Sequence, residues 1–110
     1  MLIHIPKNVD SILNEIVLRI KEVLDVSKIM LYGSYAKGNY NKDSDLDIAV
    51  FIKDNTISIK DAYRIIQKIC VTYDSDIQPQ VFSEKEIQNP IGIVEEIMHY
   101  GIEITNFNEA

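Results

Sequence analysis

This sequence lacks several features that mark membrane, secreted or redox-active proteins. It contains no apolar run close to the roughly 20 residues needed to span a bilayer. Residues 1–6 include no long apolar segment of the kind that a signal peptide carries. The single cysteine, Cys70, cannot form an internal disulfide, which suits a reducing compartment. We therefore expect a cytoplasmic protein with no membrane partner.

Basic residues are also scarce. The chain has 11 Lys and Arg against 17 Asp and Glu, a formal net charge of −6, and no run of basic residues that could follow a phosphate backbone. Because phosphate neutralisation dominates binding to long nucleic acids, we expect no direct binding of that kind. The 110 residues fit one domain, 1–110, with no separate recognition domain. Such a small domain buries a modest fraction of its surface, which favours a hetero-oligomer with a partner, or a dimer when alone.

The spacing of apolar residues predicts the main elements. Apolar residues three and four positions apart predict three helices, at 9–25, 58–72 and 91–100. Asn8 is the expected N-cap of the first helix, and Cys70 lies in the apolar stripe of the second, as a buried and inert thiol. Short apolar or alternating runs predict strands at 28–32, 45–52, 76–82 and 102–104. Pro79 indicates that the third of these strands lies at a sheet edge.

This order of elements predicts an α/β (α+β) domain: a small mixed sheet with helices on one face. In the strand 45–52, alternate residues share a face. One face carries Leu46, Ile48, Val50 and Ile52, and the other carries Asp45, Asp47, Ala49 and Phe51. We expect the acidic face to stay open to solvent.

Asp45 and Asp47 form the first candidate site. They point the same way about 7 Å apart, at a rise of about 3.3 Å per residue, and without a counter-charge they repel each other. Mg²⁺ would relieve that repulsion, since it prefers carboxylate oxygens together with substrate phosphates. On its own, an Asp-x-Asp pair is more often a solvated strand end.

Gly33 and Ser34 directly follow an apolar strand, where a turn can present backbone N–H groups and a hydroxyl to a phosphate. Lys37 either neutralises phosphate charge or is a solvated loop lysine. A P-loop is excluded, because Asn39-Tyr40 stands where Lys-Ser/Thr is required, and an EF-hand loop is excluded by Ile48.

The combined pattern is more specific than either half. Gly33-Ser34, ten residues and then Asp45-x-Asp47, each half associated with a strand, resembles the signature of DNA polymerase β-type nucleotidyltransferases. More narrowly, nearly the whole chain resembles the minimal nucleotidyltransferase (MNT) antitoxins that pair with HEPN toxins. The resemblance implies a nucleotidyltransferase fold, with the Gly33-Ser34 turn holding the triphosphate of ATP and Asp45 and Asp47 binding Mg²⁺.

The family also has a third carboxylate on a later strand. Asp76 is the best match, because it opens the predicted strand 76–82. Asp74, two residues earlier, has the same parity and would point to the same face of an extended strand, so it remains an alternative.

The resemblance implies an enzyme that transfers AMP from ATP to a protein hydroxyl, with a tyrosine of a cognate HEPN toxin as acceptor. Two alternatives remain: an idle antitoxin that neutralises its toxin by contact, and a nucleotidyltransferase acting on a small molecule or an RNA end. In the helix 91–100, Ile93, Val94, Ile97 and Met98 either dock the partner or form core, and Glu95-Glu96 is expected to be a solvated helix face. Tyr32, Tyr35 and Tyr40 either pack or stack on a base.

Overall fold

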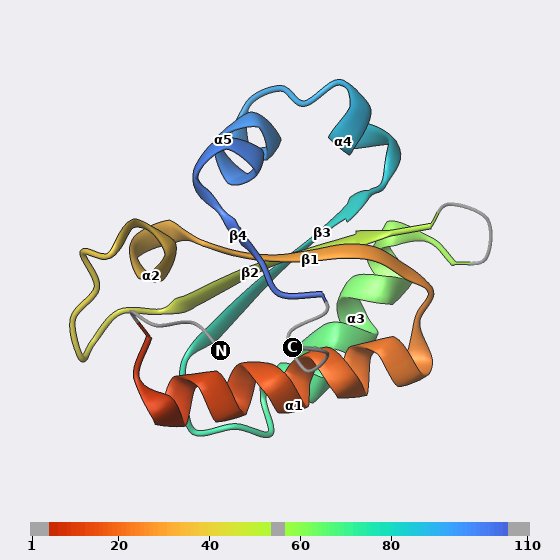
Figure 1. Ribbon diagram of the computed structural model, residues 1–110. Helices are drawn as coiled ribbons and strands as arrows, with labels where there is room; N and C mark the ends of the chain where they lie inside the picture. Colours follow the sequence, from red (N-terminus) through yellow and green to blue (C-terminus); the bar gives the residue numbers. More distant parts are fainter. Residues whose placement is uncertain (1–4, 54–56, 106–110) are drawn as a thin grey trace.

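The computed structural model describes residues 5–53 and 57–105, which form one mixed sheet with helices on both faces (Figure 1). The helices are α1 (Lys7–Val23), α2 (Gly33–Lys37), α3 (Ile59–Cys70), α4 (Lys85–Gln88) and α5 (Ile93–Tyr100). The strands are β1 (Val26–Tyr32), β2 (Leu46–Ile52), β3 (Ile77–Ser83) and β4 (Ile102–Glu103). Every predicted element is present within a few residues of its expected bounds. In the described residues, no helix is both long and apolar enough to cross a membrane.

The ends of the two long helices follow local chemistry. The carbonyl of Pro6 accepts hydrogen bonds of 3.0 Å from the N–H groups of Val9 and Asp10, so Pro6 caps α1. The expectation that Asn8 is the N-cap is wrong, because the carbonyl of Pro6 already accepts the first hydrogen bonds of the helix and α1 begins at Lys7, before Asn8. At α3, the Ser58 hydroxyl accepts a hydrogen bond of 3.1 Å from the N–H of Asp61.

The sheet has the strand order β3-β2-β1-β4. β1 pairs antiparallel with both β2 and β4, whereas β2 and β3 are parallel. The helix α3 provides the crossover that two parallel strands require. The predicted mixed sheet and α/β class are therefore confirmed, and β3, which contains Pro79, lies at the edge as expected.

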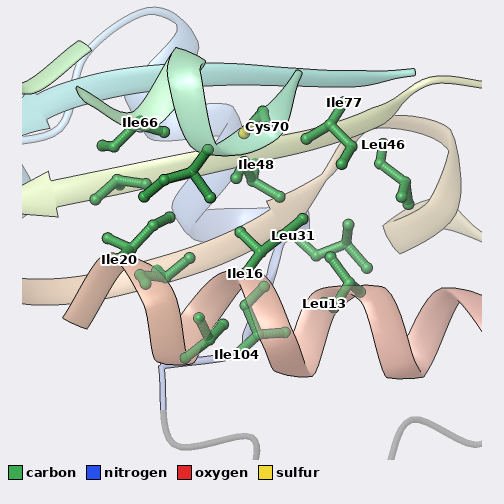
Figure 2. Packing of buried hydrophobic residues seen from close by; sticks show 14 of the residues in the cluster. Leu13, Ile16, Ile20, Leu31, Leu46, Ile48, Ile66, Cys70, Ile77 and Ile104 are labelled. Carbon is green, nitrogen blue, oxygen red and sulfur yellow. The ribbon is translucent and has the colours of Figure 1, made fainter. Parts of the chain in front are cut away.

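The larger core lies between the sheet and the helices α1 and α3 (Figures 1 and 2). Figure 2 shows α1 and α3 directing branched side chains toward the alternate residues of β1 and β2 that face them. The labelled members are Leu13, Ile16, Ile20, Leu31, Leu46, Ile48, Ile66, Cys70, Ile77 and Ile104. The Cys70 thiol is buried, as predicted, and burial raises its pKa to about 11, so that it stays neutral at physiological pH.

The second face of the sheet is not open throughout, and the prediction that the helices lie on one face is corrected here. The helices α4 and α5 lie on the side opposite α1 and α3 (Figure 1). Ala49 and Phe51 of β2 are fully buried there, in a cluster with Val94 and Ile97 of α5 and Met30 of β1. The acidic face is therefore exposed only near the start of β2, because the apolar residues farther along that strand need cover of their own.

Replacing Ile97 tests this second core. Ile97 has no exposed surface, so Ile97→Ala should lower the free energy of unfolding by about 2–5 kcal/mol through the lost contacts and the cavity. Ile91, 75% exposed on the same segment, is the matched control, and Ile91→Ala should change stability by less than about 0.5 kcal/mol. Urea unfolding measures both variants. Equal and small losses would mean that α5 does not pack against the sheet in solution.

Candidate active site

Strand pairing brings the predicted carboxylates to one end of the sheet. Asp47 lies opposite Tyr32 in the β1–β2 pair. The N–H of Leu46 donates a hydrogen bond of 2.8 Å to the carbonyl of Asp76, which places Asp76 beside the start of β2. Asp45 and Asp76 each directly precede their strand, so the predicted strands 45–52 and 76–82 begin one residue too early.

The three carboxyl groups interact with one another. A hydrogen bond between the side chains of Asp45 and Asp76, together with their mutual repulsion, raises the pKa of Asp45. Partial burial, followed by repulsion from Asp45 and Asp76, raises the pKa of Asp47. Gln78 donates a hydrogen bond of 2.7 Å to Oδ1 of Asp76, which fixes the orientation of that carboxylate. The geometry thus brings Asp76 against the pair, while Asp74 is an exposed residue of the preceding loop.

Gly33 lets the backbone approach Asp47. Its φ of +72° is one that other L-residues rarely adopt, and a Cβ at this position would overlap Oδ2 of Asp47. The turn between β1 and α2 therefore lies directly against the acidic cluster. Sequence reasoning assigned this glycine to the approach of a phosphate, and the structure shows in addition that it makes room for a carboxylate.

The acidic cluster has the chemistry to accept a divalent cation. In residues 5–53 and 57–105, no ion pair joins Asp45, Asp47 or Asp76 to a Lys or Arg, so their repulsion has no protein counter-charge there. Within the same ranges, no three acidic, histidine or cysteine side chains are grouped closely enough to enclose a metal ion. An open set of carboxylates fits Mg²⁺, which in phosphate chemistry takes one or two protein carboxylates and completes its shell with water and substrate phosphates.

Lys37 lies at the end of α2 and contacts α5. Its Nζ is 3.2 Å from Oε1 of Glu96 and 5.4 Å from the centre of the Tyr100 ring. Sequence reasoning interpreted Glu96 as part of a solvated helix face and so missed its place beside the site. No local pattern could have revealed it, because the contact joins residues 59 positions apart.

The tyrosines near the turn differ in role. Tyr35 is buried and stacks on Tyr40 with ring centres 4.4 Å apart, so these two rings pack against each other. Tyr32 is partly buried, and burial, followed by the negative charges of Asp47 and Glu96, raises its pKa to about 12. The Tyr32 hydroxyl is therefore neutral at physiological pH and lies near both carboxylates.

A pocket of about 380 Å³ adjoins Asp76. Its polar lining comes from the start of α1 and from the loops before β2 and β3. Besides Asp76, these residues are Asn8, Lys42, Asp43, Ser44, Asp74 and Ser75. Lys42 and Ser44 were interpreted from sequence only as loop, because nothing in their spacing indicates that they line a pocket with Asp76. The pocket gives the acidic cluster a concave neighbour that could receive part of a substrate.

Comparison with known protein families and curated proteins gives two matches. Residues 14–110 match the family model described as "Polymerase beta, Nucleotidyltransferase". A Methanocaldococcus jannaschii protein with the name "Putative protein adenylyltransferase" is 31% identical over 88 residues, which cover 77% of this chain and 83% of that protein.

Solved structures share the fold. A "putative nucleotidyltransferase" from Sulfolobus solfataricus superposes with a TM-score of 0.65 at 19% identity, covering 86% of this chain and 77% of the other. A toxin–antitoxin structure with AMP-PNP superposes with a TM-score of 0.58 at 22% identity, covering 86% of this chain and 70% of the other. A mutant MntA–HpeT toxin–antitoxin structure superposes with a TM-score of 0.58 at 23% identity, covering 82% of this chain and 68% of the other.

The two left-handed glycines around α2 allow a matched test of the turn. Gly33→Ala and Gly38→Ala both force alanine into a positive φ, which costs about 1–2 kcal/mol. Only Gly33→Ala also displaces Asp47, because no atom lies within 4 Å of a Cβ at Gly38. We expect Gly33→Ala to lower stability further, by about 1–3 kcal/mol. It should also abolish the Mg²⁺-dependent ATP binding that the sequence predicts, which Gly38→Ala should largely retain. Urea unfolding and calorimetry measure the two effects. Equal behaviour of the variants would contradict the role of the contact between Gly33 and Asp47.

Proposed function

This chain belongs to the polymerase β-type nucleotidyltransferase family and is a nucleotidyltransferase, and from that premise we propose that it transfers AMP from ATP to a tyrosine hydroxyl of a cognate HEPN toxin. It would thereby act as the antitoxin of a toxin–antitoxin pair.

One observation carries the proposal: Asp45, Asp47 and Asp76 converge beside the Gly33 turn with no ion-paired cation in the described residues. A protein that only binds its partner does not need mutually repelling carboxylates at a concave site. The finer assignment is supported by the name of the archaeal relative and by the toxin–antitoxin structures with the same fold, one of them with AMP-PNP.

In this proposal the residues have distinct roles. The backbone of Gly33 and Ser34 and the ammonium of Lys37 would bind the triphosphate. Asp45 and Asp47, with Asp76 beside them, would hold Mg²⁺. When bound, Mg²⁺ supplies positive charge that offsets the charge of the triphosphate and of the departing pyrophosphate. The acceptor oxygen attacks the α-phosphorus, the bond to the bridging oxygen of the β-phosphate breaks, and pyrophosphate leaves. Asp76, oriented by Gln78, accepts the proton of the acceptor hydroxyl or contributes to the metal site.

The modification would silence a ribonuclease by electrostatics. An AMP group on a tyrosine near the nuclease site adds bulk and negative charge where RNA phosphates must bind. The phosphates are then repelled, and the nuclease loses its substrate without unfolding. In this proposal the partner chain supplies the acceptor hydroxyl.

Single replacements at the acidic cluster should separate activity from stability. Asp45→Asn and Asp47→Asn each remove one ligand charge. The activation free energy of transfer should therefore rise by several kcal/mol, and the rate should fall at least about a hundredfold. Stability should hold or rise, because each change relieves like-charge repulsion. Asp76→Asn should behave like them, whereas Asp61→Asn, at the exposed start of α3, is the control that keeps transfer. Incorporation of labelled AMP and thermal unfolding provide the two readouts. Normal transfer by a folded Asp45→Asn/Asp47→Asn double variant would refute the proposed roles.

The partner can be tested directly. We expect a helical HEPN protein encoded beside this one to form a stable complex with it and, when incubated with ATP and Mg²⁺, to gain the mass of one or more AMP units. The gain should disappear with Asp45→Asn, and peptide mass spectrometry should place it on a tyrosine. An unmodified toxin that is still inhibited would instead support neutralisation by contact, and transfer to RNA or a small molecule alone would support the other alternative.

A further inference from the structure

The helix α5 holds the Lys37 ammonium through two contacts. Oε1 of Glu96 lies 3.2 Å from Nζ, and the Tyr100 ring lies below it with its centre 5.4 Å away. The two side chains of the ion pair are 41% and 47% exposed, so the pair is accessible to solvent and can open without unpacking the core. The buried face of α5, with Val94 and Ile97, anchors the helix to the sheet and keeps Glu96 in place.

Glu96 also lies on the same side of the sheet as Asp47. The helix α5 packs on Ala49 and Phe51, which share the Asp47 face of β2. The negative charges of Asp47 and Glu96 both contribute to the raised pKa of Tyr32, which ends β1 where the Gly33 turn begins. A negative group here is unexpected for a site that binds a triphosphate. Its effect on that ligand depends on where Lys37 directs its charge.

We propose that Glu96 is a positioning residue that sets the affinity for ATP by competing with the triphosphate for Lys37. The inference rests on the proposed function, in which the Lys37 ammonium neutralises triphosphate charge. A single ammonium that is held by Glu96 does not give its full charge to the phosphates. ATP binding therefore includes the free energy of opening the Lys37–Glu96 pair, and removal of the carboxylate should tighten binding.

Calorimetry of the full chain with ATP and Mg²⁺ tests the competition. Glu96→Gln should lower the dissociation constant about two- to fivefold, the range expected for an exposed ion pair. Glu95→Gln is the matched control, because Glu95 lines the same surface pocket of α5 and is not the residue that pairs with Lys37. In the transfer assay, Glu96→Gln should lower KM for ATP and leave kcat unchanged, since Lys37 would bind the triphosphate equally in the ground and transition states.

A double-mutant cycle then tests whether Glu96 acts on ATP binding through Lys37. Lys37→Met should weaken ATP binding, and in that background Glu96→Gln should give no gain. A gain that persists without Lys37 would show that Glu96 acts only as a nearby negative charge, and the inference would be wrong. Unchanged affinity of Glu96→Gln in a chain that binds ATP and transfers AMP would overturn the inference and leave the proposed function intact. Failure of the wild-type chain to bind ATP with Mg²⁺ would reject both.

Discussion

Repulsion among Asp45, Asp47 and Asp76 is the constraint on which the site depends. The main chain imposes it, since the register of β2 with β1 and β3 places all three carboxylates at one end of the sheet. Moving the three backbone positions apart would require strand pairs to slip, and a slip of one residue would turn the apolar side chains of β2 away from both cores. Packing on two faces therefore stabilises an electrostatic arrangement that is unfavourable without a bound cation.

Much of this arrangement follows from patterns that are local in the sequence. Apolar spacing predicts the helices and strands because the buried face of each element repeats with that element's own period. The Gly33-Ser34 turn and the Asp45-x-Asp47 pair were recognisable together because a strand is associated with each, and the resemblance they supported is confirmed at the level of family. Asp74 and Asp76 have the same parity, so the choice between them depended on where β3 begins. An error of one residue in that bound still left Asp76 directly beside the strand.

The features that sequence reasoning missed are contacts between distant segments. Ala49 and Phe51 share a face with Asp47, and an alternating strand does not reveal that half of that face is covered by α5. Glu96 lies in an ordinary amphipathic helix, and only the placement of α5 beside α2 gives it Lys37 as a partner. Both omissions have one cause: the pattern within an element gives its inward face but not its neighbours.

The position of Pro79 has a consequence for self-association. The carbonyl of Asp76 accepts a hydrogen bond from β2. The backbone N–H and C=O groups of successive residues in a parallel strand point alternately to its two sides. The nitrogen of Pro79, three residues after Asp76, therefore faces away from β2. No hydrogen bond to β2 is lost at that nitrogen, while the outer edge of β3 lacks a donor near its middle. A second strand, from another copy or from a misfolded chain, therefore finds an interrupted template there. One residue thus protects the open edge against edge-to-edge aggregation without weakening the sheet that holds the acidic cluster.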